Sequence, residues 1–125
     1  MARRAFNAKN TNPVGPYSHA AEADGLFFFS GQIGLDGKTG KLVTGGVAAE
    51  TEQCFRNIKE VLETAGLTEE NVVKVTVFLA DMGNFQEMNS IYEKAFSAPY
   101  PARSTIGVAS LPLGAQVEIE LIARK

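Results

Sequence analysis

Cysteine, histidine and tryptophan are nearly missing from this sequence of 125 residues, which holds one Cys, one His and no Trp. A single thiol cannot close an internal disulfide, and CxxC, HExxH and Cys/His clusters are all absent. We therefore expect no metal site and no redox pair. Long apolar runs are missing as well: no stretch approaches the roughly 20 apolar residues of a membrane span, and no apolar segment follows the basic Arg3 and Arg4. These absences predict a soluble, cytoplasmic protein with no membrane partner.

An excess of charge of either sign is also missing. Twelve Lys and Arg residues stand against 14 Asp and Glu residues, which gives a formal net charge of −2, and basic residues do not cluster beyond Arg3-Arg4. Binding to phosphate backbones needs such clusters, so nucleic acid is an unexpected primary partner. Apolar residues make up 45% of the chain. That is enough to bury a core, and the length fits one domain over residues 1–125.

The first half of the chain predicts a hairpin followed by a helix. Residues 17–23 are typical of a strand, Asp24-Gly25 is a two-residue hairpin signal, and residues 26–30 form the partner strand. Between residues 47 and 65 the apolar side chains recur at helical spacing, and Gly66 ends the predicted helix.

The second half predicts a central strand, a second helix and two closing strands. Residues 72–79 are β-branched throughout, with Val73, Val75, Val77 and Leu79 in one row. Phe85, Met88, Tyr92 and Phe96 mark the apolar stripe of a helix that ends before Pro99. Strands are expected over residues 103–109 and 116–123. The order ββ(β)αβαββ predicts an α+β sandwich of one mainly antiparallel sheet with two helices on one face.

Two helices can cover only one face of that sheet. Residues 26–29 are nevertheless apolar on both faces, and Phe78 lies opposite the Val75 row. An exposed apolar patch of that size is rare on a soluble monomer, so we infer a symmetric homo-oligomer that packs through the sheet. The alternative is a strand covered by the chain's own loops.

Arg103 is the most informative polar residue, because it is the only Lys or Arg between Lys94 and Arg124. In the last strand Val117, Ile119 and Leu121 share one face, which puts Glu118 and Glu120 together on the other. A guanidinium in a partly desolvated groove suits a substrate carboxylate, and a nearby Glu could position or deprotonate a water. The alternative is a structural Arg–Glu ion pair at the interface.

Weaker candidates accompany these residues. Tyr17 and Asn89 are polar groups that could satisfy backbone atoms as well as a ligand. Ser30-Gly31 is either a strand end or a place where the backbone approaches a ligand closely. His19, without a second metal ligand or a nucleophile, is expected to make a structural hydrogen bond.

Four segments together resemble the reactive intermediate deaminase (Rid) family, in the expected order and across nearly the whole chain. They are Gly15-Pro16-Tyr17-Ser18-His19-Ala20, Ser30-Gly31-Gln32-Ile33-Gly34-Leu35-Asp36, Pro101-Ala102-Arg103-Ser104-Thr105 and Val117-Glu118-Ile119-Glu120. The resemblance implies a chorismate-mutase-like fold and a homotrimer whose inter-subunit clefts bind small carboxylates without cofactor or metal. It also implies hydrolysis of enamines and imines, such as 2-aminoacrylate and 2-iminobutyrate, to 2-oxo acids and ammonia.

The resemblance also implies roles for individual residues. Arg103 would clamp the substrate carboxylate and Glu118 would hold the attacking water. Tyr17 and Ser30 would line the cleft by hydrogen bonding, and Gly31 would let the backbone approach the substrate. The proton for the leaving amine would come from Tyr17, from Glu118 or from solvent, so Tyr17 is a candidate catalytic residue beside Arg103 and Glu118. The remaining implied cleft residues are Asn89 and Thr105. Many family members have Cys at the position of Thr105, so an obligatory thiol nucleophile is not expected here.

Two functions of other classes stay open. One is a non-catalytic trimer that binds a metabolite in the same cleft and acts as a regulator. The other is an endoribonuclease or translation inhibitor, as some family relatives are described. The absence of basic clusters counts against direct RNA binding.

Overall fold

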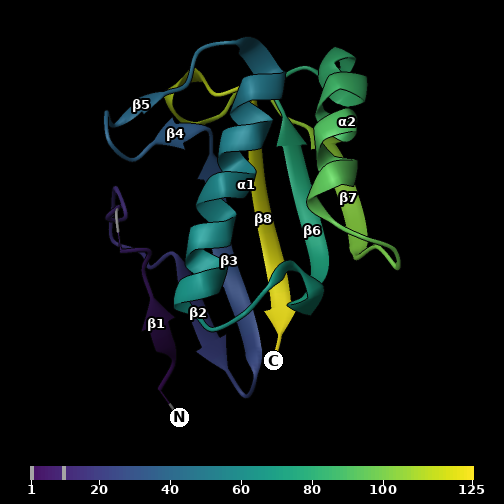
Figure 1. Ribbon diagram of the computed structural model, residues 1–125. Helices are drawn as coiled ribbons and strands as arrows, with labels where there is room; N and C mark the ends of the chain where they lie inside the picture. The colour runs from purple at the N-terminus through teal and green to yellow at the C-terminus, as the bar shows by residue number, and fades with distance from the viewer. Residues whose placement is uncertain (1, 10) are drawn as a thin grey trace.

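The computed structural model describes residues 2–9 and 11–125, and its centre is a six-stranded sheet (Figure 1). The strand order is β1-β2-β3-β8-β6-β7, and every neighbouring pair is antiparallel except β6 and β7, which are parallel. A separate two-stranded ribbon pairs β4 with β5. The strands are β1 Arg4–Phe6, β2 Ala20–Ala23, β3 Leu26–Ile33, β4 Leu35–Asp36, β5 Lys41–Leu42, β6 Val72–Leu79, β7 Ala102–Gly107 and β8 Val117–Arg124.

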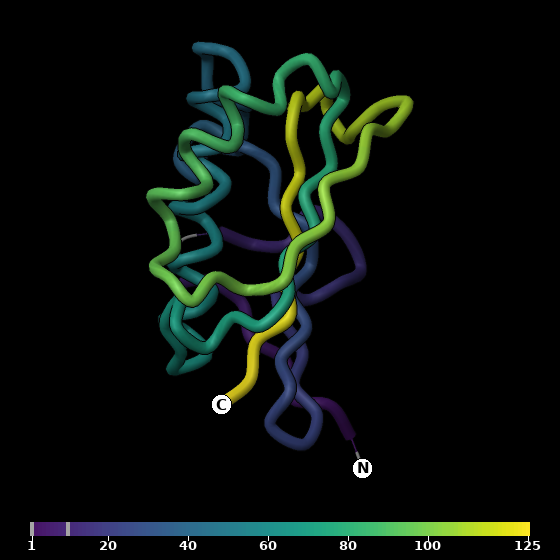
Figure 2. Tube along the Cα trace, turned by 90° about the vertical axis from the view of Figure 1, so that its right-hand side faces the viewer, coloured from purple at the N-terminus to yellow at the C-terminus, as the bar shows by residue number. Residues whose placement is uncertain are grey.

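Two α-helices form a second layer on one face of this sheet, as the edge-on view in Figure 2 shows. They are α1, Gly46–Thr64, and α2, Phe85–Ala95, and they pack against each other. Helix α1 ends where Gly66 takes a φ of 77°, which lets the N–H of Leu67 reach the carbonyl of Leu62. This is the glycine stop expected from the sequence, and the predicted α+β architecture is confirmed.

The core lies between the helices and the sheet. Alternate residues of β8 and β6 are fully buried there, and Met88, Cys54 and Val61 fill the space from the helix side. Val73 was expected in the buried row of β6 but is 47% exposed. The pairing of β6 with β8 shifts register between Val72 and Lys74, so Val72 is buried in its place. A bulge at the strand end thus overrides the simple alternation.

The hairpin prediction is confirmed at its turn and was inexact at its strand ends. Asp24 and Gly25 both have positive φ, as the tight turn between β2 and β3 requires. Strand β2 begins only at Ala20, because residues 14–17, which contain the Gly15-Pro16 pair, form a bend. Strand β3 continues past Ser30 to Ile33, with a register shift between Phe29 and Gln32. That irregular segment contains the predicted Ser30 and Gly31.

The other face of the sheet is not covered by any helix of the described residues. Apolar side chains stand exposed on it, among them Leu26, Phe28 and Ile106, at 40%, 48% and 46% of their full area. Lys74 also lies on this face, where its ammonium reaches the Ser104 hydroxyl at 3.0 Å. Within the described ranges no helix has the length and apolar character that a bilayer span would need.

Candidate functional site

Arg103 projects from the edge strand β7 toward helix α2. Its Nη1 donates a 2.7 Å hydrogen bond to the side-chain oxygen of Asn89. The guanidinium carbon also lies over two rings of α2, 4.5 Å from the centroid of Tyr92 and 5.5 Å from that of Phe85. Helix α2 therefore holds the arginine head by one hydrogen bond and two cation–π contacts.

The guanidinium remains available to a ligand. No carboxylate of the described residues forms an ion pair with Arg103; the ion pair that does form joins Arg4 to Glu22, at 3.0 Å. The alternative of a structural Arg–Glu pair at an interface between subunits stays a prediction. Arg103, Asn89 and Tyr92 line a cavity of about 410 Å³, completed by Glu93, Tyr100 and Pro101. Arg103 is therefore a cation without a carboxylate partner among the described residues, beside a space that could accept an anion.

Glu118 lies on β8 and faces the open side of the sheet, since its neighbours Val117 and Ile119 are fully buried on the helix side. Burial raises the pKa of its carboxyl, and the negative charge of Glu120 raises it further. A carboxylate with a raised pKa accepts a proton more readily at neutral pH, as a general base must.

Gly31 leaves the space that the Glu118 carboxylate occupies. A β-carbon at Gly31 would lie 2.8 Å from the carboxyl carbon of Glu118 and would overlap its oxygen. Close approach is thus the reason for a glycine here, as the sequence suggested, but the group that approaches is a side chain of the same protein.

Tyr17, Gly31 and Glu118 line one shared cavity of about 410 Å³. The segment around Tyr17 forms one wall, and strand β3 forms another. Tyr17 itself is 45% exposed. The remaining lining residues are Thr11, Asn12, Val14, His19, Gln32, Ile33, Leu35, Asn57, Pro112 and Leu113.

The positions of Ser30 and Thr105 give weaker support for a role in ligand binding. The Ser30 hydroxyl donates a 2.7 Å bond to the carbonyl of Ser18 and so ties the N-terminal segment to β3. Ser30 lines a neighbouring depression of about 620 Å³ with Tyr17. The Thr105 hydroxyl, two residues beyond Arg103 on β7, is buried without a hydrogen-bond partner among the described residues. This hydroxyl could still form a hydrogen bond close to Arg103.

The predicted site residues form two groups on opposite faces of the sheet. Arg103 contacts the helix layer, whereas Glu118 faces the open side. Strand β6 separates β7 from β8. One chain therefore brings Tyr17, Gly31 and Glu118 together, and Arg103 with Asn89, but not the two groups with each other.

His19 and Cys54 have structural surroundings. The Nδ1 of His19 accepts a 3.0 Å bond from the backbone N–H of Ala8, which confirms the expected structural hydrogen bond, and burial lowers the pKa of the imidazole. Cys54 is fully buried, donates to the carbonyl of Gln32, and has its thiol pKa raised by burial. The thiol has no access to substrate.

Phe85 and Tyr92 are the residues of this site that sequence reasoning missed. Their apolar spacing placed them on the stripe of α2, where Tyr92 is indeed 4% exposed. The available signal was that Phe85, Asn89 and Tyr92 follow one another at i, i+4 and i+7. That spacing puts an amide between two rings on one helix face.

Comparison with known proteins shows the family of this chain. A family model described as Endoribonuclease L-PSP matches residues 7–125. The human 2-iminobutanoate/2-iminopropanoate deaminase is 47% identical over 124 residues, covering 98% of this chain and 90% of its own.

Solved structures show the same fold. A protein of the conserved Rid family, YyfA from Yersinia pestis, superposes with a TM-score of 0.95 at 40% identity and covers 99% of this chain and 100% of its own. TdcF from E. coli, solved with bound serine, gives 0.91 at 31% identity, with 98% of each chain covered. The resemblance expected from the four segments is confirmed, and the chain belongs to the Endoribonuclease L-PSP family, which includes the Rid proteins.

Proposed function

We propose that this protein hydrolyses small 2-imino and 2-enamino acids, such as 2-iminobutyrate and 2-aminoacrylate, to 2-oxo acids and ammonia. An enamine first becomes the imine by moving one N–H proton to C3. In the net reaction of the imine, one water adds its oxygen to C2, the C–N bond breaks, and the nitrogen leaves as ammonia after gaining the two protons of that water. The protein must hold the substrate, orient the water and move a proton.

The observation that carries this proposal is the unpaired guanidinium of Arg103. Nη1 is already fixed by Asn89, and no carboxylate of the described residues pairs with the head. A planar fork held in place beside a cavity is complementary to the carboxylate of a 2-imino acid. Bound there, the substrate would present its imine carbon at a fixed distance from the anchor.

Glu118 is proposed to hold the attacking water. With its pKa raised by burial, the carboxylate accepts a proton as the water oxygen attacks C2 of the protonated imine, giving a neutral carbinolamine. The same proton is then returned to the amine nitrogen. As the C–N bond breaks and releases ammonia, the C=O bond forms and the hydroxyl proton passes to solvent. Tyr17 and Ser30 would line the cleft near the reacting centre. The protein's groups balance the step without a covalent intermediate.

We further propose that the working site forms between subunits of a homotrimer. The reason is the placement of the two groups on opposite faces of one sheet, which a second copy can resolve. The open face that carries Glu118 also exposes Leu26, Phe28 and Ile106. Those side chains would be covered if the β7 region of the next subunit, with Arg103, lay near Glu118.

The comparisons support the proposed chemistry. The human relative carries the name of an imine deaminase, and the E. coli relative was solved with serine, a small amino acid with a carboxylate. A site for a serine-sized carboxylate is consistent with an Arg103 anchor and cavities of a few hundred Å³.

The decisive experiment is an imine-hydrolysis assay on freshly made 2-iminobutyrate, generated in place by a threonine dehydratase. The protein should accelerate formation of 2-oxobutyrate and ammonia in proportion to its concentration. A matched sample of the Arg103→Ala variant controls for spontaneous hydrolysis. If the intact protein leaves the rate of imine loss unchanged, the proposed function is wrong.

The family description favours a second candidate, cleavage of RNA. A net charge of −2 and the lack of basic clusters oppose tight binding to a phosphate backbone. Incubation of the protein with labelled single-stranded RNA at low salt tests this candidate directly. Cleavage that disappears in the Glu118→Gln variant would support it, and intact RNA would exclude it.

A further inference from the structure

One face of helix α2 is built around the head of Arg103. Phe85, Asn89 and Tyr92 occupy positions i, i+4 and i+7, so they follow one another along that face. Asn89 accepts one N–H of the guanidinium, and the two rings lie against it. The contact with Tyr92 is the closer of the two.

We propose that Tyr92 is a positioning residue whose ring holds the Arg103 guanidinium in the orientation that receives the substrate carboxylate. This inference rests on the proposed function, because it assigns Arg103 the role of anchor. It adds a residue that takes no part in the proton transfers and whose effect on substrate binding is exerted through the arginine.

A ring is suited to this task because of where guanidinium groups carry their donors. All five N–H groups point outward in the plane of the head, so a ring over the guanidinium leaves them available. One donor is engaged by Asn89. Cation–π attraction strengthens when the contact is desolvated, and Tyr92 is 4% exposed. The long arginine side chain would otherwise sample many rotamers.

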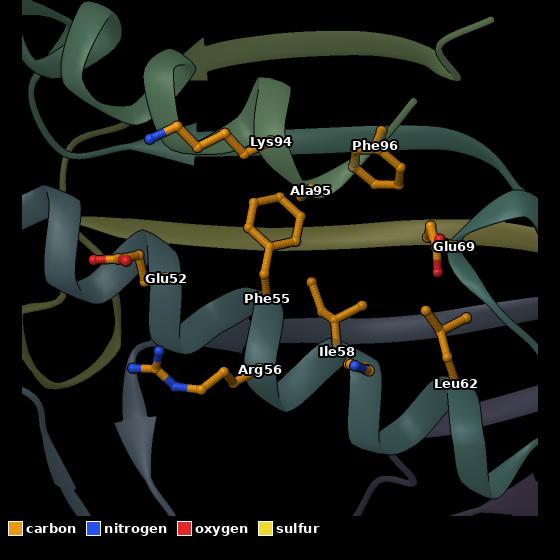
Figure 3. A pocket seen from close by; sticks show the side chains of 10 residues that line it. Glu52, Phe55, Arg56, Ile58, Leu62, Glu69, Lys94, Ala95 and Phe96 are labelled. Atoms are coloured by element: carbon orange, nitrogen blue, oxygen red, sulfur yellow. The ribbon is translucent and has the colours of Figure 1, made fainter. Parts of the chain in front are cut away.

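The ring of Tyr92 also packs against two other aromatic rings. Its ring contacts Phe96 at 5.2 Å and Phe55 of α1 at 5.8 Å between centroids, and Phe55 and Phe96 contact each other at 5.8 Å. Phe55 and Phe96 also line a cavity of about 420 Å³ between the two helices (Figure 3). The aromatic cluster therefore spans from that cavity to the arginine, and Tyr92 is its end at the site.

The ring of Tyr92, and not its hydroxyl, carries the proposed role. The hydroxyl is buried without a hydrogen-bond partner among the described residues. Burial also raises its pKa, so the group stays neutral. Replacing Tyr92 by Phe removes an unpaired polar atom and keeps the face on which the guanidinium lies.

The test compares Tyr92→Leu and Tyr92→Phe with a matched control. Phe6→Leu is that control, because Phe6 also lies under an arginine, with the Arg4 head 5.2 Å from its centroid, and packs against the core from β1, at the sheet edge opposite to β7. Steady-state KM and kcat are measured on 2-iminobutyrate and on an imine with a methyl group in place of the carboxylate. Thermal melting is recorded for every variant.

Tyr92→Leu should raise KM for 2-iminobutyrate about 10-fold with little change in kcat, because it weakens an interaction made equally in ground and transition states. Its kinetics on the imine without a carboxylate should match the wild type. Tyr92→Phe should retain the wild-type KM. Phe6→Leu should lower the melting temperature and leave both kinetic constants within about twofold, since its arginine contact lies outside the site.

The inference is overturned if Tyr92→Leu, folded, binds and turns over 2-iminobutyrate as the wild type does, or if it affects both substrates equally. Failure of the proposed function gives a different result, namely no turnover by the wild type. In that case calorimetric titration with 2-oxobutyrate still tests the anchor. Weaker binding by Tyr92→Leu than by Phe6→Leu supports the role of the ring, and equal binding refutes it.

Discussion

The partners of Arg103 within the described chain are the neutral side chains of Asn89, Phe85 and Tyr92. A substitution of Arg103 should therefore affect substrate binding more than folding stability. Arg103→Ala should cost roughly 3 to 6 kcal/mol of transition-state binding, or about 10² to 10⁴ in kcat/KM, because a bidentate charged clamp is lost. Arg103→Lys should rescue poorly, since an ammonium lacks the planar fork. No ion pair with a described carboxylate is broken, so the melting temperature should change by only a few degrees. A folded Arg103→Ala variant with the wild-type rate on 2-iminobutyrate would remove this residue from the anchor role.

Glu118 should control the acid limb of the pH profile. Its folded pKa is raised above the ordinary value of 4.5 by burial and by Glu120. Because the ionised form is the base, kcat/KM should fall as pH decreases through that raised pKa. Glu118→Gln should lose about 10² to 10⁴ in rate and should also lose this limb from the residual activity. Near-normal kcat in a folded Glu118→Gln protein would show that the water is held elsewhere.

Gly31 should act through Glu118. The methyl group of Gly31→Ala overlaps the carboxylate, and the flexible carboxylate must move aside, so we expect a loss of at least about tenfold in kcat with a folded protein. The effects of two groups that act as one are not additive. Gly31→Ala combined with Glu118→Gln should therefore be no slower than Glu118→Gln alone. Independent, multiplying losses would mean that Gly31 serves the substrate directly.

Some residues of the proposed site could be predicted from the sequence, and others could not. Arg103 could be singled out because no other cation lies near it along the chain, and Glu118 because alternation fixes its face. Tyr92 could not be recognised as more than a core residue, since a ring at a core position has the same spacing whichever group it touches. The spacing within α2 indicates that Tyr92 shares a helix face with Phe85 and Asn89. It does not specify which group this face meets, because the pairing of Tyr92 with Arg103 is a tertiary contact across the helix and sheet layers.

At the scale of elements, residue types fixed the centres of helices and strands better than their ends. Strand β6 is found at the predicted residues 72–79 because five of its eight residues are β-branched, which favours extended backbone. Strand β3 was predicted three residues too short, because Ser30 and Gly31 are typical of a strand end. The strand continues there through an irregular pairing with β8, and such a bulge depends on the partner strand.

The link between the N-terminal segment and strand β2 should be sensitive to pH. The Ala8 N–H donates to Nδ1 of His19, and a protonated imidazole would present a second donor to it. Burial lowers the folded pKa of His19 below its ordinary value of 6.5, against a smaller opposing effect of Glu60. The unfolded chain therefore binds more protons between the two pKa values. Stability should be complete above about pH 6.5 and should decrease as pH falls below it.

His19→Asn provides the control for this pH dependence. The Asn side-chain oxygen can take the place of Nδ1 as an acceptor but does not titrate in this range. Urea unfolding between pH 5 and 7.5 should show a slope for the wild type that is absent in His19→Asn. The protection factor of the Ala8 amide, which is its exchange rate relative to the intrinsic rate at the same pH, should fall in acid in the wild type only. Equal slopes for both proteins would assign the pH dependence to other groups.

At the scale of the whole molecule, the sheet acts as a partition between the two halves of the proposed site. Helices cover the Arg103 side, and the open side carries Glu118 together with exposed apolar residues. The sequence indicated an uncovered face, because two helices cannot cover both. It could not indicate that Arg103 and Glu118 lie on different faces, since the direction of the Arg103 side chain depends on its contact with Asn89.

This partition gives the sharpest test of an inter-subunit site, which is complementation between two inactive variants. Arg103→Ala subunits keep Glu118, and Glu118→Gln subunits keep Arg103. In a trimer assembled at random from equal amounts, a given site draws an intact Arg103 from one subunit and an intact Glu118 from the next with a probability of about one quarter. The two proteins, unfolded and refolded together, should recover about 25% of wild-type activity.

Two controls make that result decisive. Light scattering must give a mass of three chains of 13.4 kDa for the wild type, both variants and the mixture. The double variant Arg103→Ala/Glu118→Gln, refolded with an equal amount of wild type, supplies intact residues only from wild-type subunits and should also give about one quarter per site. If each site lay within one chain, that second mixture would retain about half of the activity. The mixture of single variants would then recover nothing, because no subunit would carry both intact residues.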